Sequence, residues 1–162
     1  MRLALISDTH IAAGSWPLPF RCCELIGASD LVVHAGDITT VEGLAAIQEI
    51  GPPVRAVAGN MDSPALQAQL PEVDEIEVEG AVIAVVHDAG RSEGRLERLK
   101  DQFPRADAVV FGHTHEPLNQ QTGGFQIFNP GSPTDPRLAP RPTMGLAEVT
   151  SGQVQFELIS LD

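Results

Sequence analysis

Five short apolar segments of this 162-residue chain are each followed closely by a side chain that can bind a metal ion. These side chains are Asp8, Asp37, Asn60, His87 and His113. Two further candidates, His10 and His115, lie two residues after Asp8 and His113. In an extended backbone, residues at this spacing point to the same side. All seven groups offer nitrogen or oxygen ligands, so the pattern predicts a metal centre.

The number of ligands indicates two cations rather than one. Seven nitrogen and oxygen groups exceed the needs of a single cation, whereas two cations that share a bridging carboxylate use about this number. Asp37 is our candidate for the bridge. Because the set contains no thiolate, it suits Mn, Fe, Co, Ni or Zn, and ligand type does not choose among them. Two cations about 3.5 to 4 Å apart can hold a hydroxide ion and stabilise a phosphoryl oxygen, as in two-metal ester hydrolysis.

The charge of the chain narrows the class of substrate. There are 10 Lys and Arg residues against 22 Asp and Glu residues, which gives a net charge of −12. A basic face for long nucleic acids is therefore not expected, and Trp16 with six Phe residues offers no base-stacking platform. Bound cations would reverse the local field and admit a phosphate. We expect a small phosphate ester as the substrate.

The elements that must position these residues are predicted from the apolar segments. They are short, continuous and mostly β-branched, which is typical of strands covered on both faces. The carboxyl ends of strands in an open parallel sheet lie along one edge, so the five side chains should converge there. The predicted strands are Leu3–Ile6, Leu31–Val33, Val54–Ala58, Val82–Val86 and Ala108–Phe111.

Helix signals separate these strands, which favours crossover units and a largely parallel sheet. Capping residues and prolines mark the expected ends. The predicted helices are one that Thr39 and Glu42 cap and that runs to Ile50, one that Ser63 and Pro64 open and Pro71 ends, one between Ser92 and Pro104, and a weaker one over Phe20–Ile26.

The second half of the chain is predicted to be rich in strands. No helix signal follows Gly112, and Phe125–Phe128, Met144–Val149 and Val154–Ile159 have the pattern of strands. Before them, the segment Glu72–Glu79 alternates acidic and apolar residues, which predicts a strand at a sheet edge with one charged face.

The length corresponds to one domain over residues 1–162. Only the four-residue run Leu3–Ile6 precedes Asp8, which is too short for a signal-peptide core or a membrane span. We therefore expect a cytoplasmic protein that does not contact a membrane. The adjacent Cys22 and Cys23 are predicted to be two thiols at a helix surface, with a vicinal redox pair as the alternative.

Taken in order, these residues resemble the motifs of the calcineurin-like metallophosphoesterases. The resemblance covers residues 6–137. A later Asn129-Pro130-Gly131-Ser132, followed by Arg137, is similar to the small single-domain branch that includes bacterial phosphodiesterases and the retromer scaffold subunit. The five motifs are Asp8-Thr9-His10, Gly36-Asp37, Gly59-Asn60, His87 and Gly112-His113-Thr114-His115.

The resemblance implies a fold and a division of the ligands. The fold would be a four-layer αββα sandwich of two mixed β-sheets flanked by helices. One metal would be held by Asp8, His10 and His115, the other by Asn60, His87 and His113, with Asp37 bridging the two. Asn60 would also contact the substrate.

The sequence departs from the family at Met61, where many relatives have a histidine that protonates the leaving oxygen or binds the phosphate. A thioether cannot donate a proton. Asp88 replaces the more common glycine and is interpreted either as a group that orients His87 or as a turn residue. His34 is interpreted as a packed core histidine, and Arg137 as a solvated loop arginine rather than a phosphate contact.

These features favour a two-metal phosphoesterase that hydrolyses small phosphodiesters, with monoesters left open, by attack of a metal-bridging hydroxide. The alternative is a protein-interaction scaffold of the same fold with little or no hydrolysis. A regulator that binds a nucleotide without cleaving it is a third hypothesis. A homo-oligomer is left open, because the apolar segment from Trp16 to Phe20 could serve as an interface.

Overall fold

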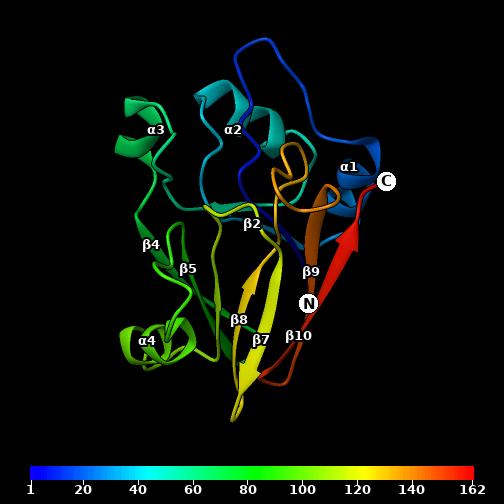
Figure 1. Ribbon diagram of the computed structural model, residues 1–162. Coiled ribbons are helices and arrows are strands. Elements are labelled where there is room, and N and C mark those ends of the chain that lie inside the picture. The colour runs from blue at the N-terminus through cyan, green and yellow to red at the C-terminus, as the bar shows by residue number, and fades with distance from the viewer.

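A computed structural model describes residues 1–162 as two mixed β-sheets that pack face to face, with helices outside them (Figure 1). The first sheet has five strands in the order β10-β9-β1-β2-β3. The neighbours β1, β2 and β3 are parallel to one another, whereas β9 is antiparallel to both of its neighbours, β1 and β10. Its strands are β1 (Arg2–Ile6), β2 (Leu31–His34), β3 (Val54–Ala56), β9 (Thr143–Thr150) and β10 (Gln153–Ser160).

The second sheet also has five strands, in the order β4-β5-β6-β8-β7. Its three central strands β5, β6 and β8 are parallel, and the edge strands β4 and β7 are antiparallel to their neighbours. Its strands are β4 (Val73–Val78), β5 (Ala81–Val86), β6 (Ala108–Val110), β7 (Leu118–Thr122) and β8 (Phe125–Asn129).

Alternation along β1 shows how the layers form. Leu3 and Leu5 belong to the apolar cluster between the sheets, together with Ile83 and Val110 of the second sheet. The intervening residues Ala4 and Ile6 join a second cluster with helix residues. Because successive side chains of a strand point to opposite faces, a strand that is apolar throughout is covered on both sides.

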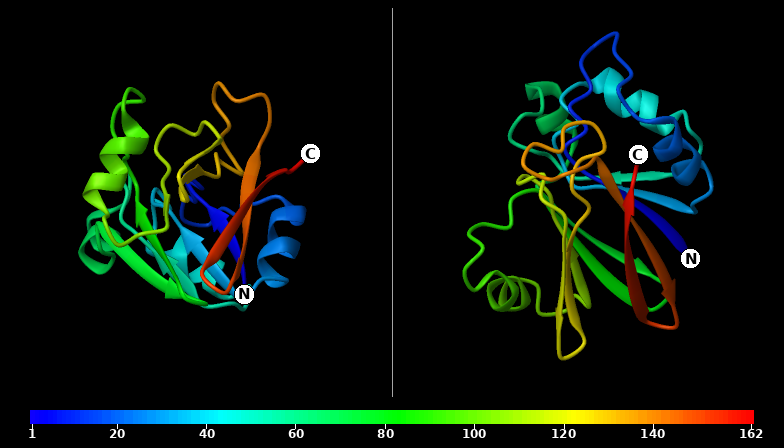
Figure 2. Two further views of the ribbon diagram at one scale, coloured as in Figure 1. Left: turned by 90° about the horizontal axis from the view of Figure 1, so that it is seen from below. Right: turned by 45° about the vertical axis from the view of Figure 1, so that its right-hand side comes forward.

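The helices complete the outer layers. The clusters place α1 and α2 on the first sheet and α4 on the second, and α1 and α4 lie on opposite outer sides in the left view of Figure 2. The four-layer αββα arrangement expected from the sequence is confirmed. The helices are α1 (Phe20–Gly27), α2 (Val41–Gln48), α3 (Pro64–Gln69) and α4 (Arg95–Gln102).

Two expected helix caps are wrong and one is confirmed. Thr40 rather than Thr39 caps α2, since its hydroxyl accepts a hydrogen bond from the backbone N–H of Gly43. Gly94, in the left-handed conformation, precedes α4 in place of a Ser92 cap. Ser63 caps α3 as predicted.

The five predicted core strands exist, but they do not form one open sheet. Strands β1, β2 and β3 lie in the first sheet, and β5 and β6 lie in the second. The acidic strand β4 is an edge strand, as predicted. The sequence analysis missed β7, because Leu118–Thr122 is polar apart from its first residue and pairs with β8 at an exposed edge.

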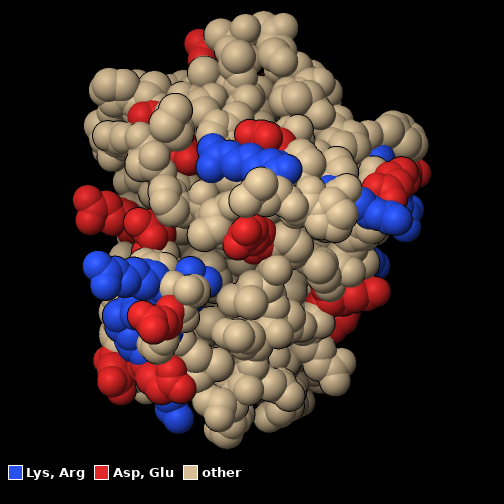
Figure 3. Space-filling model, viewed as in Figure 1, with Lys and Arg blue, Asp and Glu red and all other residues tan.

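Other expectations concern the surface. Cys22 of α1 is not exposed but buried in the apolar cluster between the helices and the first sheet. Burial raises the pKa of its thiol to about 12. Charged side chains of both signs gather over α4, whereas the face over β7 and β8 carries few (Figure 3). None of the helices has the length and apolar character needed to cross a membrane.

The close approach of the two sheets at Gly145 gives a test of the packing. A Cβ at this position of β9 would overlap the ring of Phe128 and lie 3.2 Å from Leu5 Cβ. We expect Gly145→Ala to lower the free energy of unfolding by about 1 to 3 kcal/mol in urea denaturation, because overpacked cores distort.

Gly27→Ala serves as the control, because its new Cβ would have its nearest neighbour, Ile50 Cγ2, at 3.8 Å. Its stability should be unchanged or raised by up to about 1 kcal/mol. Equal stability of the two variants would contradict the described packing.

Candidate metal centre

The ends of five strands from both sheets meet at one end of the sandwich. Contacts between the following side chains show this, because Asp37 after β2 lies 3.3 Å from the ring nitrogen Nε2 of His87 after β5. Asn60 Oδ1 lies 3.0 Å from the same nitrogen and 3.1 Å from Nδ1 of His113 after β6. All seven predicted ligands therefore gather in one region, although the reason differs from the single sheet edge expected from the sequence.

The first group of candidate ligands consists of Asp8, His10 and His115, whose ligand atoms lie within 4.8 Å of one another. His115 Nε2 is 3.3 Å from Asp8 Oδ1. Asp8 Oδ1, His10 Nε2 and His115 Nε2 are buried and have no hydrogen-bond partner. Buried polar atoms without partners are rare and costly, and three that face one another fit a divalent cation.

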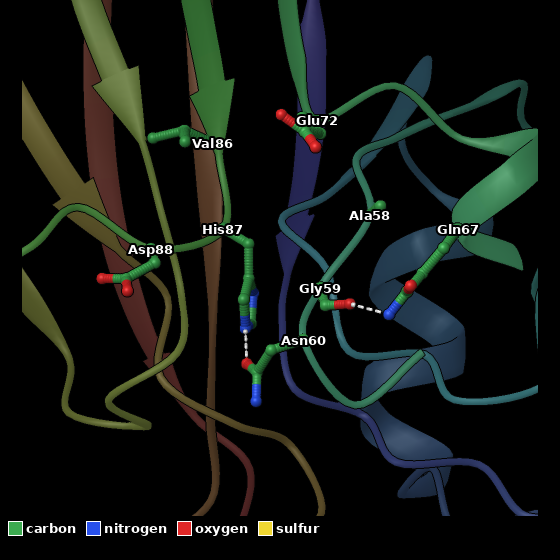
Figure 4. Close-up of a pocket in the computed structure, with 8 residues that line it drawn as sticks. All are labelled: Ala58, Gly59, Asn60, Gln67, Glu72, Val86, His87 and Asp88. Atoms are coloured by element: carbon green, nitrogen blue, oxygen red, sulfur yellow. Dashed lines mark hydrogen bonds between the residues drawn. The ribbon is translucent and has the colours of Figure 1, made fainter. Parts of the chain in front are cut away.

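The second group forms around His87. Its Nδ1 lies 2.7 Å from the carbonyl oxygen of Ala35, and since a carbonyl can only accept, Nδ1 holds the ring proton. Its Nε2 then presents a lone pair toward two oxygen acceptors, Asp37 Oδ2 and Asn60 Oδ1 (Figure 4). Converging lone pairs need a proton or a cation between them, so these residues also fit a metal ion.

Two carboxylates lie between the groups. Asp37 Oδ2 is 3.8 Å from His10 Nε2 of the first group and 3.3 Å from His87 Nε2 of the second. Asp8 also belongs to both sets, because its ligand atom clusters with Asp37 and His87 as well as with the two other histidines. The placement of Asp37 suits the bridge proposed from the sequence, and Asp8 is a second carboxylate within reach of both positions.

The electrostatics of the centre favour charged forms. Burial alone would raise the pKa of Asp8 and of Asp37, but contacts with His115 and Ser7 for Asp8, and with His87 and the Met61 amide for Asp37, outweigh burial and lower each pKa. For His87 and His115, burial lowers the pKa, and the facing carboxylates Asp37 and Asp8 more than compensate. Both carboxylates are therefore ionised and able to bind cations.

The backbone at the ligands is left-handed. Asp8, His10, Asp37, His113 and His115 all have φ between 44° and 70°, a region that residues other than glycine seldom adopt. The extended i, i+2 geometry expected for the pairs 8/10 and 113/115 is therefore wrong, although the paired side chains do face the same region. Backbone of this kind is typical of functional sites, where the surrounding structure holds it in place.

Glycines allow the ligand loops to approach one another. A Cβ at Gly59 would overlap Asp37, and one at Gly112 would overlap Ser7. A Cβ at Gly36 would lie 2.6 Å from His87 Nδ1. Three glycines of the sequence motifs thus provide close packing around the ligands.

The segment after Asn129 supports the centre, a role that the sequence analysis missed. Ser132 Oγ donates a hydrogen bond to the carbonyl of Asp8, and Thr134 Oγ1 donates one to the carbonyl of Thr9. His115 Nδ1 lies 2.5 Å from the carbonyl of Asp135, which orients the ring as Ala35 orients His87. The Asn-Pro-Gly-Ser pattern signalled a turn but not these distant partners.

The remaining candidates lie around the centre. His34 is fully buried and bonded through Nε2 to Thr9 Oγ1 and through Nδ1 to the amide of Gly36, as expected for a core histidine. Burial lowers its pKa to about 3. Asp88 accepts a hydrogen bond from the amide of Gly90 and is a turn residue, so it does not orient His87. Arg137 is half exposed and lies 3.6 Å from Asp135.

This fold and this group of residues are matched by one family of proteins. The model of the calcineurin-like phosphoesterase superfamily domain matches residues 1–152. The chain therefore belongs to the calcineurin-like phosphoesterases.

Relatives cover nearly all of the chain. It is 34% identical to a probable metallophosphoesterase of Methanocaldococcus jannaschii over 100% of this chain and 82% of the relative. It is 30% identical to the phosphodiesterase YfcE of Escherichia coli K12 over 85% of this chain and 82% of that protein. A Vps29 of Entamoeba histolytica solved in complex with zinc has a TM-score of 0.78 at 21% identity, covering 100% of both chains, which shows the same fold.

We expect metal analysis after dialysis to find two divalent cations per chain in the unaltered protein. Asp37→Asn should lose at least one of them, because the amide places no negative charge between the two groups. The matched control is Asp101→Asn, an exposed position on α4. Full metal content in Asp37→Asn would contradict the bridging role.

Proposed function

We propose that this protein is a two-metal-dependent phosphoesterase that hydrolyses small phosphodiesters. The observation that supports this most directly is the set of facing, unpartnered ligand atoms of Asp8, His10 and His115 beside the second group at His87. The proposed ligands are Asp8, His10 and His115 for one cation and Asn60, His87 and His113 for the other, with Asp37 between them. The metals would be Mn, Ni, Fe, Co or Zn.

A bound pair of divalent cations lowers the pKa of water to near neutrality and stabilises negative charge on phosphoryl oxygens. The chain supplies the positioning. His87 and His115 are each fixed by a hydrogen bond from Nδ1 to a backbone carbonyl, which holds Nε2 toward the centre. This type of support sets the orientation of a ligating imidazole and is worth about 10- to 100-fold in metal affinity or activity.

Asn60 is placed to contact the substrate. Its Oδ1 faces the two imidazoles of His87 and His113, so its Nδ2 group points away from them (Figure 4). This amide can donate a hydrogen bond to a phosphoryl oxygen. Because Asn60 is also exposed, the donor is accessible from solvent.

By the family resemblance, Met61 takes the position where many relatives have a histidine that protonates the leaving oxygen. Met61 is 57% exposed, and its backbone amide donates to Asp37 Oδ1 at 2.7 Å. Since a thioether cannot protonate a leaving group, poor leaving groups should react slowly. Positioned proton transfer is typically worth about 10²- to 10⁴-fold in rate.

The phosphodiesterase relative in Escherichia coli favours a diester substrate for this chain. The likeness to Vps29 concerns the fold, and a scaffold has no chemical need for seven converging ligands. A scaffold without hydrolysis is therefore an outcome of the test rather than the favoured function. The cytoplasmic location remains a prediction.

The decisive measurement is hydrolysis of bis(p-nitrophenyl) phosphate beside p-nitrophenyl phosphate, with chelator-treated protein resupplied with Mn²⁺, Ni²⁺ or Zn²⁺. We expect metal-restored cleavage with a higher kcat/KM for the diester, and loss of cleavage in Asp37→Asn. Folded protein that cleaves neither ester with any metal would favour the scaffold.

Met61→His should raise kcat/KM for diesters with poor leaving groups by roughly 10-fold or more, because the variant adds a proton donor while keeping the backbone bond to Asp37. Activated p-nitrophenyl esters should change little. Met61→Gln, which is polar but not acidic in this range, is the control. An unchanged ratio of poor to activated esters in Met61→His would rule out the missing acid as the limitation.

A further inference from the structure

His34 is the one polar residue of β2, and its side chain is fully buried. Its two ring nitrogens make hydrogen bonds to the two loops that follow β1 and β2. We call residues 7–11 the first ligand loop and residues 35–39 the second. The candidate ligands on these loops are Asp8, His10 and Asp37. His34 is itself not a candidate ligand, so its contacts must explain why a polar ring lies in this apolar strand.

The hydrogen bonds of His34 define one tautomer of its ring. The backbone amide of Gly36 donates to Nδ1 at 3.1 Å, so Nδ1 carries a lone pair. The ring proton therefore lies on Nε2, which donates to Thr9 Oγ1 at 2.9 Å. Thr9 lies between the two candidate ligands of the first loop, and Gly36 directly precedes Asp37 in the second. One side chain thus connects the two ligand loops.

Backbone hydrogen bonds also pair the two loops. The amides of Asp8 and His10 each donate to a carbonyl of the second loop at 3.0 Å. The candidate ligands on both loops have φ between 44° and 60°, so the surrounding structure must hold their left-handed backbone in place. A side-chain bond at Thr9, midway between the two backbone bonds, restrains the first loop against the second.

An apolar side chain at position 34 could fill the same space but could not replace these bonds. The Thr9 hydroxyl and the Gly36 amide are both in buried residues, and each would lose its bond to the ring. Because buried polar groups without partners are costly, the loops would shift until these groups found other partners. The ligand atoms of Asp8 and Asp37 would shift with them.

We propose that His34 is a positioning residue that holds the first ligand loop against the second and thereby sets the spacing of the two cation positions. The inference rests on the proposed function for its effect on metal binding. His34 does not touch a cation or the substrate in this proposal. It acts through Thr9 and Gly36, the neighbours of the candidate ligands.

The connection between the loops can be tested without metal. In the chelator-treated protein, Thr9→Val replaces the hydroxyl by a methyl group, and we expect several-fold faster hydrogen exchange of the Asp8 and His10 amides, which bond to the second loop. Thr9→Ser keeps the hydroxyl and should restore slow exchange. Val149→Ala creates a cavity between the sheets, away from the loops. This control should change exchange of the two amides no more than that of other buried amides.

The effect on metal binding is measured by titration with Co²⁺, whose visible absorption reports the geometry of its ligands. His34→Asn keeps an acceptor for Gly36 but loses the donor to Thr9. We expect His34→Asn and Thr9→Val each to raise the Kd for Co²⁺ about 10-fold and to change the absorption spectrum. The double variant should bind no more weakly than either single variant, because both changes remove the same bond. Thr9→Ser and Val149→Ala should bind Co²⁺ as the unaltered protein does.

The outcomes separate positioning from a purely structural role. Additive effects of the two changes on Kd, or an unchanged Kd beside lowered stability, would overturn the proposal. Unchanged exchange of the Asp8 and His10 amides in Thr9→Val would overturn it even if the protein hydrolyses phosphodiesters. If the unaltered protein binds no Co²⁺, the proposed function fails, whereas faster exchange in Thr9→Val still supports His34 as the residue that holds the loops together.

Discussion

The constraint on which the rest of this structure depends is that lone pairs from two separate sheets must face one another in a largely buried space. In each of the best-defined candidate ligands, one polar atom of the side chain makes hydrogen bonds to the protein and the other faces the centre. Asp8 uses Oδ2 to accept from Ser7 and from the amide of His113, and leaves Oδ1 without a partner. His87 and His115 use Nδ1 for backbone carbonyls and turn Nε2 inward. One atom fixes the side chain, and the other remains for a cation.

The fold serves this arrangement by bringing the carboxyl ends of two sets of parallel strands together. The left-handed backbone at the ligands is unfavourable in isolation, and the close contacts at Gly36, Gly59 and Gly112 leave no room for a side chain. The apolar cluster between the sheets stabilises the fold, and this well-packed core supports the strained, polar loops that carry the candidate ligands.

Much of this could be predicted from the sequence, and the errors have physical causes. The buried strands and the seven candidate ligands could be picked out because continuous apolar runs and the polar residues after them are local signals. The assignment of those strands to two sheets came from the family resemblance, since periodicity does not report which strands pair. Strand β7 was missed because a polar edge strand has little apolar pattern. The hydrogen bond from Ser132 to the carbonyl of Asp8 joins residues 124 positions apart, so no local sequence pattern indicates it.

That long-range support makes the candidate centre depend on residues far beyond the candidate ligands in the sequence. All seven candidate ligands lie before residue 116, yet the carbonyls of Asp8 and Thr9 accept hydrogen bonds from Ser132 and Thr134, and β1 pairs with β9. A chain that ended before Ser132 would contain every candidate ligand but would lack the hydrogen bonds that hold the loop of Asp8 and Thr9. The geometry of the first group therefore depends on a segment that contributes no candidate ligand itself.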